Sequence, residues 1–152
     1  MKNTAPLAKA IRIAAAVHEN QLDRAGEPFV LHPLRVMMRV QGEDEKVVAA
    51  LHDVIESSDW TLDMLRAEGF PERVVAAVDA LSRRCDDKGK REKYDTFVAR
   101  ACENPLARRI KEADLLDNMD VSRLPELGPA DLKRLAKHHR ALLKVRSLLS
   151  EP

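Results

Sequence analysis

Four side chains of types that bind divalent metal ions stand at three places in the 152-residue sequence: His32, the adjacent pair His52-Asp53, and Asp114. A His-Asp dipeptide arises easily by chance, so its setting matters more than its presence. Helical periodicity places His52, Asp53 and Glu56 within about one turn of each other. They lie away from an apolar face made by Val47, Val48, Leu51, Val54 and Ile55. This group is either a solvated polar face or one side of a metal site.

Asp114 stands in a different setting, because it falls within the apolar stripe of its helix. Leu106, Ala107, Ile110 and Ala113 form that stripe. A carboxylate on a buried face costs several kcal/mol unless it is paired or bound to a metal ion. Asp114 therefore needs a cation, which is either a lysine or arginine side chain or a metal ion. Asn118, four residues later, shares its side of the helix.

Taken together, His32, His52, Asp53 and Asp114 make a set of two histidines and two aspartates. Mixed nitrogen and oxygen ligands suit a divalent first-row ion such as Mn²⁺, Fe²⁺ or Zn²⁺. Such an ion lowers the pKa of bound water and polarises phosphoryl oxygens. Glu56 is the natural proton acceptor beside it. The other histidines suggest less, since His18 is typical of a core residue on an apolar stripe and the pair at 138–139 is typical of a helix surface.

The elements that must position these residues are helices throughout. Apolar spacing, first-turn prolines and glycine breaks predict seven or eight of them and no convincing strand. The expected helices cover about 7–18, 33–40, 44–56, a short one after Thr61, 71–82, 94–102, 105–119 and 129–149, with a short extended piece at 29–31. The charged segment 82–93 is either a solvated loop or a mobile basic loop that binds phosphates. The fold class is therefore all-α.

Composition limits the class of protein. At 45% apolar residues and 152 residues in all, the chain fits one domain spanning 1–152. Lysine and arginine total 26 against 25 aspartates and glutamates, so the basic excess expected of a nucleic-acid binder is missing. No apolar run approaches the ~18 residues of a membrane span. Two cysteines without a C-x-x-C pair indicate a reducing compartment, the cytoplasm.

Three blocks of the sequence resemble the HD-domain phosphohydrolases, in particular the hydrolase domain of the RelA/SpoT alarmone enzymes and the stand-alone small alarmone hydrolases. The first block joins His18 and Gln21 to GEPFVLHP at 26–33. The second is AALHDVIE at 49–56, and the third is IKEADLLDNM at 110–119. Their order and spacing cover about residues 7–123, which is most of the chain.

The resemblance implies an all-α HD-domain fold around one metal ion, usually Mn²⁺, held by His32, His52, Asp53 and Asp114. It also implies an activity, the removal of the 3′-pyrophosphate from (p)ppGpp or a related alarmone such as ppApp by metal-activated water. Glu56 would be the general base and Ser57 would position the water through its hydroxyl. The residues expected to bind the phosphorylated nucleotide are Arg24, Lys111 and Asn118.

The sequence departs from the family pattern at three positions. The family's Glu-Asp pair reads Glu56-Ser57, the first residue of its basic pair is Asp23, and the arginine that follows Asn-Met is Asp120. Because an aspartate cannot stack on a base as an arginine does, guanine specificity is open. Two alternatives follow: a phosphohydrolase for another small nucleotide or phosphoester, and a nucleotide-sensing module without catalysis. A nucleic-acid module using the basic last helix is disfavoured by the near-zero net charge.

Overall fold

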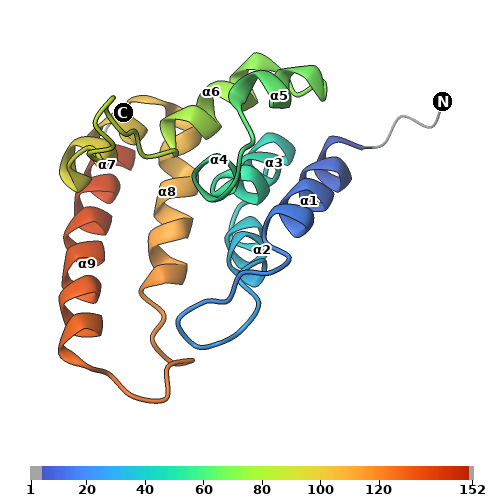
Figure 1. The fold of residues 1–152 in the computed structure, drawn as a ribbon. Coiled ribbons are helices and arrows are strands. Elements are labelled where there is room, and N and C mark those ends of the chain that lie inside the picture. The colour runs from blue at the N-terminus through green and yellow to red at the C-terminus, as the bar shows by residue number, and fades with distance from the viewer. Residues whose placement is uncertain (1–4, 151–152) are drawn as a thin grey trace.

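The computed structural model describes residues 5–150, and within them the chain is helical apart from its loops (Figure 1). The helices are α1 (Pro6–Val17), α2 (Leu31–Met38), α3 (Glu43–Leu51), α4 (Val54–Ser57), α5 (Leu62–Ala67), α6 (Glu72–Ala80), α7 (Tyr94–Glu103), α8 (Pro105–Asn118) and α9 (Pro129–Leu149). The extended pairing found in these residues amounts to two isolated bridges. The all-α prediction is confirmed.

Helix α3 is the centre of the packing, since it contacts α1, α2, α6 and α8. These helices, together with α5, enclose a large core of Val, Leu, Ile and Ala side chains. Helix α8 also faces a second, smaller core that it shares with α7 and α9. In Figure 1 α8 accordingly stands between α9 on one side and α1–α4 on the other. Asp114 lies on α8 between these two apolar faces, and it is only 5% exposed.

Several helices begin where capping residues and first-turn prolines in the sequence predict that they begin. The Thr61 hydroxyl accepts a hydrogen bond from the backbone N–H of Met64 and caps α5. The Asn104 side chain accepts from two backbone N–H groups at the start of α8, where Pro105 takes the first helical position. Pro129 does the same for α9. None of these helices combines the length and hydrophobicity needed to cross a bilayer.

The helix predicted over 33–40 is present but begins and ends two residues earlier, and the extended piece predicted at 29–31 was wrong. Helix α2 begins at Leu31 and ends at Met38, so His32 lies in its first turn. Pro33 does not prevent this, because the N–H groups of a first turn have no partner within the helix and a proline there forfeits no bond. His32 is therefore fixed by helical backbone, which holds its ring at the protein interior.

The predicted continuous helix over 44–56 was also wrong. Helix α3 ends at Leu51, the chain turns at His52 and Asp53, and α4 adds one further turn. The His52 ring donates from Nδ1 to the backbone carbonyl of Ala49 at 2.6 Å, a contact that helical periodicity does not reveal. Neighbouring residues of an unbroken helix point about 100° apart. The turn lets the side chains of His52 and Asp53 both point toward Asp114, and His52 is only 2% exposed.

Replacing Ile110 by alanine tests the packing of α8 against the larger core. Ile110 is fully buried there, so we expect the free energy of unfolding to fall by about 2–5 kcal/mol in urea denaturation. Leu132→Ala on α9 is the matched control, because Leu132 is 52% exposed and should cost less than about 0.5 kcal/mol. Equal losses for the two variants would contradict this description of the core.

Candidate metal centre

The structure brings together the four side chains predicted to bind a metal ion. Ligand atoms of His32, His52 and Asp53 lie within 4.8 Å of one another. His32 Nε2 is 3.0 Å from Asp114 Oδ1 and 3.5 Å from Asp53 Oδ2. His52 Nε2 is 3.2 Å from Asp53 Oδ2 and 3.5 Å from Asp114 Oδ1. Two imidazole nitrogens thus face two carboxylate oxygens across a small space.

The tautomers of both histidines suit a metal ion. The Nδ1 of His32 is 2.7 Å from Asp117 Oδ2, and the Nδ1 of His52 is 2.6 Å from the Ala49 carbonyl oxygen. Each of these acceptors requires a proton on Nδ1, which leaves a lone pair on Nε2 of a neutral ring. His52 Nε2 is buried and has no hydrogen-bond partner among the residues described. Lone pairs facing carboxylates need a shared cation between them, so the donor set fits a divalent ion.

Without a metal ion, protons on the rings are the alternative source of positive charge. Burial by itself lowers the pKa of His32, but the hydrogen bonds to Asp114 and Asp117 outweigh it and raise that pKa to about 9. Burial acts in the same direction on His52, where the charge of Asp53 raises the pKa well above its ordinary value. The site is therefore built for positive charge at this position, from protons or from a metal ion.

Asp114 is held by its own helix. Lys111 Nζ donates to its Oδ2 at 2.8 Å, and Asn118 Nδ2 donates to its Oδ1 at 2.9 Å. Burial favours the neutral acid, but the charge of Lys111 and the contacts with both histidines keep the pKa of Asp114 well below its usual range. Both alternatives left open for Asp114 are thus present, since it has a lysine partner and also faces the histidine pair.

Lys111, predicted to bind substrate, is only 5% exposed. Its ammonium lies 4.7 Å from the centre of the Phe97 ring and 5.8 Å from that of Tyr94, which adds cation–π attraction to the ion pair. Lys111 nevertheless lines the cavity of about 220 Å³ around the cluster of His32, His52, Asp53 and Asp114, as do Glu56 and Asn118. Lys111 therefore has two roles: it holds the Asp114 carboxylate in place, and it adds a positive charge to the cavity wall.

Glu56 lines the same cavity and is held by the segment 82–93. Its carboxylate accepts from the backbone N–H of Arg83 and lies 3.5 Å from the Arg91 guanidinium. Burial raises the pKa of Glu56, and the Arg83 hydrogen bond opposes part of that rise. The segment 82–93 is thus a loop, as predicted, and its contacts from Arg83 and Arg91 attach it to Glu56 at the cavity wall. An isolated bridge between Cys85 and Arg91 closes the loop on itself.

Ser57 and Arg24 lie farther from the cluster. The backbone carbonyl of Ser57 accepts a hydrogen bond from the Gln21 side chain at 3.3 Å. Ser57 is not among the residues that line the cavity of about 220 Å³. The Arg24 side chain is 65% exposed at the rim of an adjoining cavity of about 360 Å³. Gly26, with φ of 81°, makes the turn that follows Arg24 in this loop.

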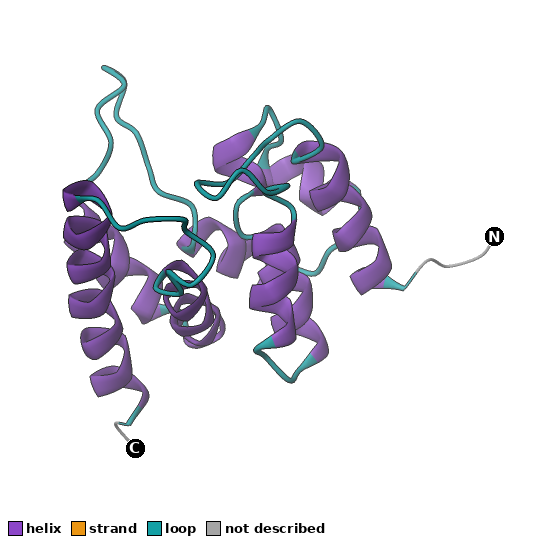
Figure 2. Ribbon diagram, turned by 90° about the horizontal axis from the view of Figure 1, so that it is seen from below, coloured by secondary structure: helices purple, strands orange, loops and turns teal. Residues whose placement is uncertain are grey.

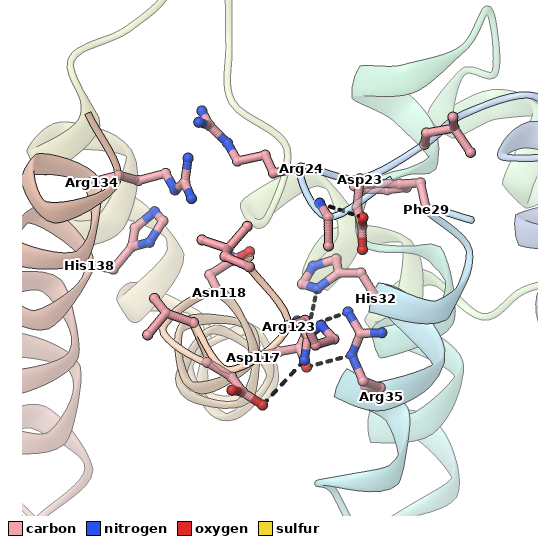
Figure 3. Close-up of a pocket in the computed structure, with 15 residues that line it drawn as sticks. Asp23, Arg24, Phe29, His32, Arg35, Asp117, Asn118, Arg123, Arg134 and His138 are labelled. Atoms are coloured by element: carbon pink, nitrogen blue, oxygen red, sulfur yellow. Dashed lines mark hydrogen bonds and ion pairs between the residues drawn. The ribbon is translucent and has the colours of Figure 1, made fainter. Parts of the chain in front are cut away.

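Sequence reasoning missed two residues of the site. Asp117 is 1% exposed and joins His32 to the Arg35 guanidinium, which donates to it at 2.8 and 3.1 Å (Figure 3). The prediction that His138 lies on a helix surface was wrong: it is 9% exposed and lines both cavities, while His139 is exposed. The spacing of Leu135, His138 and Leu142 along α9 was the available signal, because it places His138 within the apolar stripe.

Changing Asp117 to asparagine tests its role behind His32. A carboxylate that accepts from the far nitrogen of a metal-binding histidine fixes the ring and strengthens it as a ligand. We expect Asp117→Asn to weaken Mn²⁺ binding about 10–100-fold in a calorimetric titration. Asp120→Asn, an exposed carboxylate one turn away, should leave the affinity unchanged. An Asp117→Asn protein that binds Mn²⁺ like the unaltered chain would contradict the role.

The helices and this cluster define an HD-type helical domain with a His-His-Asp-Asp site. No family model matches the sequence. Curated relatives include two guanosine-3′,5′-bis(diphosphate) 3′-pyrophosphohydrolases. That of Aquifex aeolicus is 33% identical, over 73% of this chain and 17% of the relative. That of Haemophilus influenzae is 32% identical, over 82% of this chain and 20% of the relative. The bifunctional (p)ppGpp synthase/hydrolase SpoT of Escherichia coli is 29% identical over 86% of this chain and 20% of its own length. The chain thus spans about a fifth of these relatives.

Among solved structures, a metazoan ortholog of SpoT that hydrolyses ppGpp has the same fold, with a TM-score of 0.75. The alignment covers 95% of this chain and 87% of that protein at 22% sequence identity. The chain therefore resembles the hydrolase domain of the RelA/SpoT alarmone enzymes both in sequence and in fold. This confirms the resemblance that its three sequence blocks predict.

Proposed function

We propose that this chain is a metal-dependent phosphohydrolase that removes the 3′-pyrophosphate from (p)ppGpp or a related alarmone such as ppApp. The observation that supports it best is the pair of Nε2 lone pairs facing Asp53 and Asp114, in a chain similar to named ppGpp 3′-pyrophosphohydrolases. His32, His52, Asp53 and Asp114 would hold Mn²⁺, with Fe²⁺ or Zn²⁺ as the other ions suited to this donor set. The bound ion would supply Lewis acidity toward a phosphoryl oxygen and an acidified water.

Each of the chain's own residues would have a separate role in the reaction. Glu56 takes a proton from the attacking water, whose oxygen bonds to the phosphorus attached to ribose O3′. The bond between that phosphorus and O3′ breaks, and O3′ gains the proton that Glu56 took from the water. The products are pyrophosphate and the nucleoside 5′-diphosphate, or the 5′-triphosphate where the substrate carries one. Lys111 and Asn118 keep Asp114 in place and present donors to the bound phosphates, and Arg24 adds a charge at the rim.

The proposal extends to the setting of the reaction. Residues 1–152 would act as one HD-type domain, on a small phosphorylated nucleotide in the cytoplasm, without nucleic acid or membrane as partner. Cys85, which is exposed, and Cys102, which is buried, are both free thiols, as a reducing compartment favours.

A second candidate is the same chemistry on another nucleotide, and Asp23 favours it. The Asp23 carboxylate accepts from the backbone N–H groups of Ala25 and Glu27, both at 2.9 Å, and so stabilises its own loop. An aspartate in this position offers no cation to stack on a purine. Asp23 therefore favours a nucleotide with a different base. Ser57, which stands where the family has an acidic partner for Glu56, favours a sensor that binds the nucleotide without cleaving it.

A substrate panel distinguishes these functions. Purified protein with Mn²⁺ would be offered ppGpp, ppApp and nucleoside monophosphates separately, with products separated by anion-exchange chromatography. The proposal predicts pyrophosphate and a 5′-diphosphate from ppGpp or ppApp. Phosphate release from a monophosphate alone would establish the second candidate, and tight binding with no product would establish the sensor.

A further inference from the structure

Segment 82–93 connects α6 to α7 as a loop, one of those drawn in teal in Figure 2. Its Arg83 N–H and Arg91 guanidinium supply the hydrogen bonds that the Glu56 carboxylate accepts within residues 5–150. Glu56 itself lies on α4, a helix of four residues in which Val54 alone is buried. The direction of the Glu56 carboxylate in the cavity therefore depends on where this loop is held.

Apolar packing does not hold the loop in place. Residues 83–93 include no member of either hydrophobic core, and most of them are exposed. The turn at the tip of the loop is local, because the N–H of Gly89, which has a φ of 76°, donates to the Asp86 carbonyl at 2.9 Å. The position of the loop relative to α4 must therefore come from polar contacts nearer its two ends.

Arg100 on α7 makes such contacts at both ends of the loop. Its Nη2 donates to the Ser82 carbonyl at 2.9 Å, and its Nη1 donates to the Asp79 carbonyl of α6 at 3.3 Å. The same guanidinium donates to both carboxylate oxygens of Glu92, at 2.5 and 3.4 Å. The side chains of Arg100 and Glu92 are only 18% and 16% exposed, so water and salt screen this ion pair less than a surface pair.

Glu92 extends this constraint to the residue that contacts Glu56. Its carboxylate accepts from the Arg84 N–H at 2.9 Å, and its own N–H donates to the Arg84 carbonyl at 2.9 Å. The Glu92 carbonyl also accepts from Arg83 Nε at 2.8 Å. The backbone on both sides of Arg83 is thus held, which fixes the direction of the N–H that donates to Glu56.

We propose that Arg100, acting through Glu92 and the loop, is a positioning residue that holds the Arg83 N–H against Glu56 and so keeps the Glu56 carboxylate directed into the cavity. Arg100 does not itself line that cavity. Glu56 enters here as the general base, so this inference rests on the proposed function in that one respect. A general base must lie within hydrogen-bond reach of the proton it removes, and a Glu56 side chain released from the loop would be there less often.

The first test compares the steady-state kinetics of Arg100→Gln with those of the unaltered chain, both loaded with Mn²⁺ and supplied with ppGpp or ppApp. Loss of a general base costs about 10²–10⁴-fold, and loss of its orientation should cost a part of that, about 10-fold in kcat. KM and Mn²⁺ affinity should change little, since Arg100 lines neither cavity. Arg100→Lys can still pair with Glu92 but lacks the planar fork that reaches the carbonyl groups, so it should lose less. Unchanged kcat in Arg100→Gln would overturn the positioning role.

Arg108→Gln is the matched control for lost stability. Arg108 also donates from a part-buried guanidinium to backbone carbonyls, those of Cys102 at 2.7 Å and Leu148 at 3.1 Å, and none of these contacts involves the loop. This variant should unfold at a lower urea concentration, as Arg100→Gln should, but keep the kcat of the unaltered chain. An equal fall of kcat in the two variants would mean that Arg100 acts through stability alone, which contradicts the positioning role.

A double mutant separates the positioning of Glu56 from any other effect of Arg100. In a Glu56→Gln chain the general base is already absent, so adding Arg100→Gln should lower the remaining kcat by less than about 2-fold. A loss of about 10-fold in both backgrounds would mean that Arg100 acts independently of Glu56, and the positioning role would then be wrong.

Amide hydrogen exchange, measured by NMR on the full chain, tests the same contact without turnover. The Arg83 amide should exchange at least about 10-fold faster in Arg100→Gln, because the backbone around it is released, and at its normal rate in Arg108→Gln. Faster exchange in a chain that hydrolyses no alarmone would refute the proposed function and leave the positioning of Glu56 standing. Unchanged exchange in Arg100→Gln would refute the positioning role, whatever the chain hydrolyses.

Discussion

Replacing Asp53 by alanine is expected to abolish Mn²⁺ binding and turnover together. Asp53 Oδ2 lies 3.2 Å from His52 Nε2 and 3.5 Å from His32 Nε2, so its loss removes one of two carboxylates that offset the charge of the ion. Because altering a supporting residue already costs about 10–100-fold in affinity, loss of a ligand should weaken Mn²⁺ binding by more than about 100-fold. Calorimetric titration with Mn²⁺ and pyrophosphate release from ppGpp measure the two effects.

Asp59→Ala is the control for this experiment, because Asp59 is an exposed aspartate six residues away. It should bind Mn²⁺ and turn over like the unaltered chain. Full activity of Asp53→Ala at an unchanged Mn²⁺ requirement would eliminate the proposed ligand set. Loss of turnover with normal Mn²⁺ affinity would assign Asp53 a role in catalysis but not in metal binding.

The second large effect is expected from Glu56→Gln. Glutamine keeps the size of the side chain and a carbonyl oxygen for the Arg83 N–H, but it cannot accept a proton. Loss of a general base typically costs 10²–10⁴-fold, so kcat should fall by about that factor. Mn²⁺ affinity should change little, because Glu56 is outside the set of proposed ligands and contacts none of them. Steady-state kinetics and metal titration on the same preparation provide both numbers.

Glu43→Gln provides the matched control, since Glu43 is an exposed glutamate at the start of α3. Its kcat should equal that of the unaltered chain. If Glu56→Gln retained full kcat, proton removal would have to be assigned to another group of the cavity. The same variant also tests whether Glu56 acts without the acidic partner that Ser57 replaces.

Much of the fold was predictable because its boundaries depend on local chemistry. Thr61, Asn104 and the prolines at 105 and 129 act through backbone groups a few residues away, and sequence spacing reveals such contacts. The turn at residues 52–53 was not predictable. It depends on the hydrogen bond between the His52 ring and the Ala49 carbonyl, and on the packing of four helices against α3. Hydrophobic periodicity indicates neither of these contacts.

The candidate site divides in the same way. The residue types of His32, His52, Asp53 and Asp114 predicted a metal site, and the structure brings these side chains together. The position of Asp114 on an apolar face predicted a nearby cation, and Lys111 is one. Asp117 was not found, since its contacts with His32 and Arg35 join residues more than 80 positions apart. Its position three residues after Asp114 on the same helix was the only local signal.

In the proposed function, a metal ion at the His-His-Asp-Asp cluster supports hydrolysis of a 3′-pyrophosphate. The most direct measurement adds Mn²⁺ stepwise to metal-stripped protein and follows pyrophosphate release from ppGpp and, separately, ppApp. We expect no release from the stripped protein, a rise with each addition, and a plateau at one ion per chain for at least one substrate. Release from the stripped protein at the same rate, or none from either substrate at saturating Mn²⁺, would contradict it.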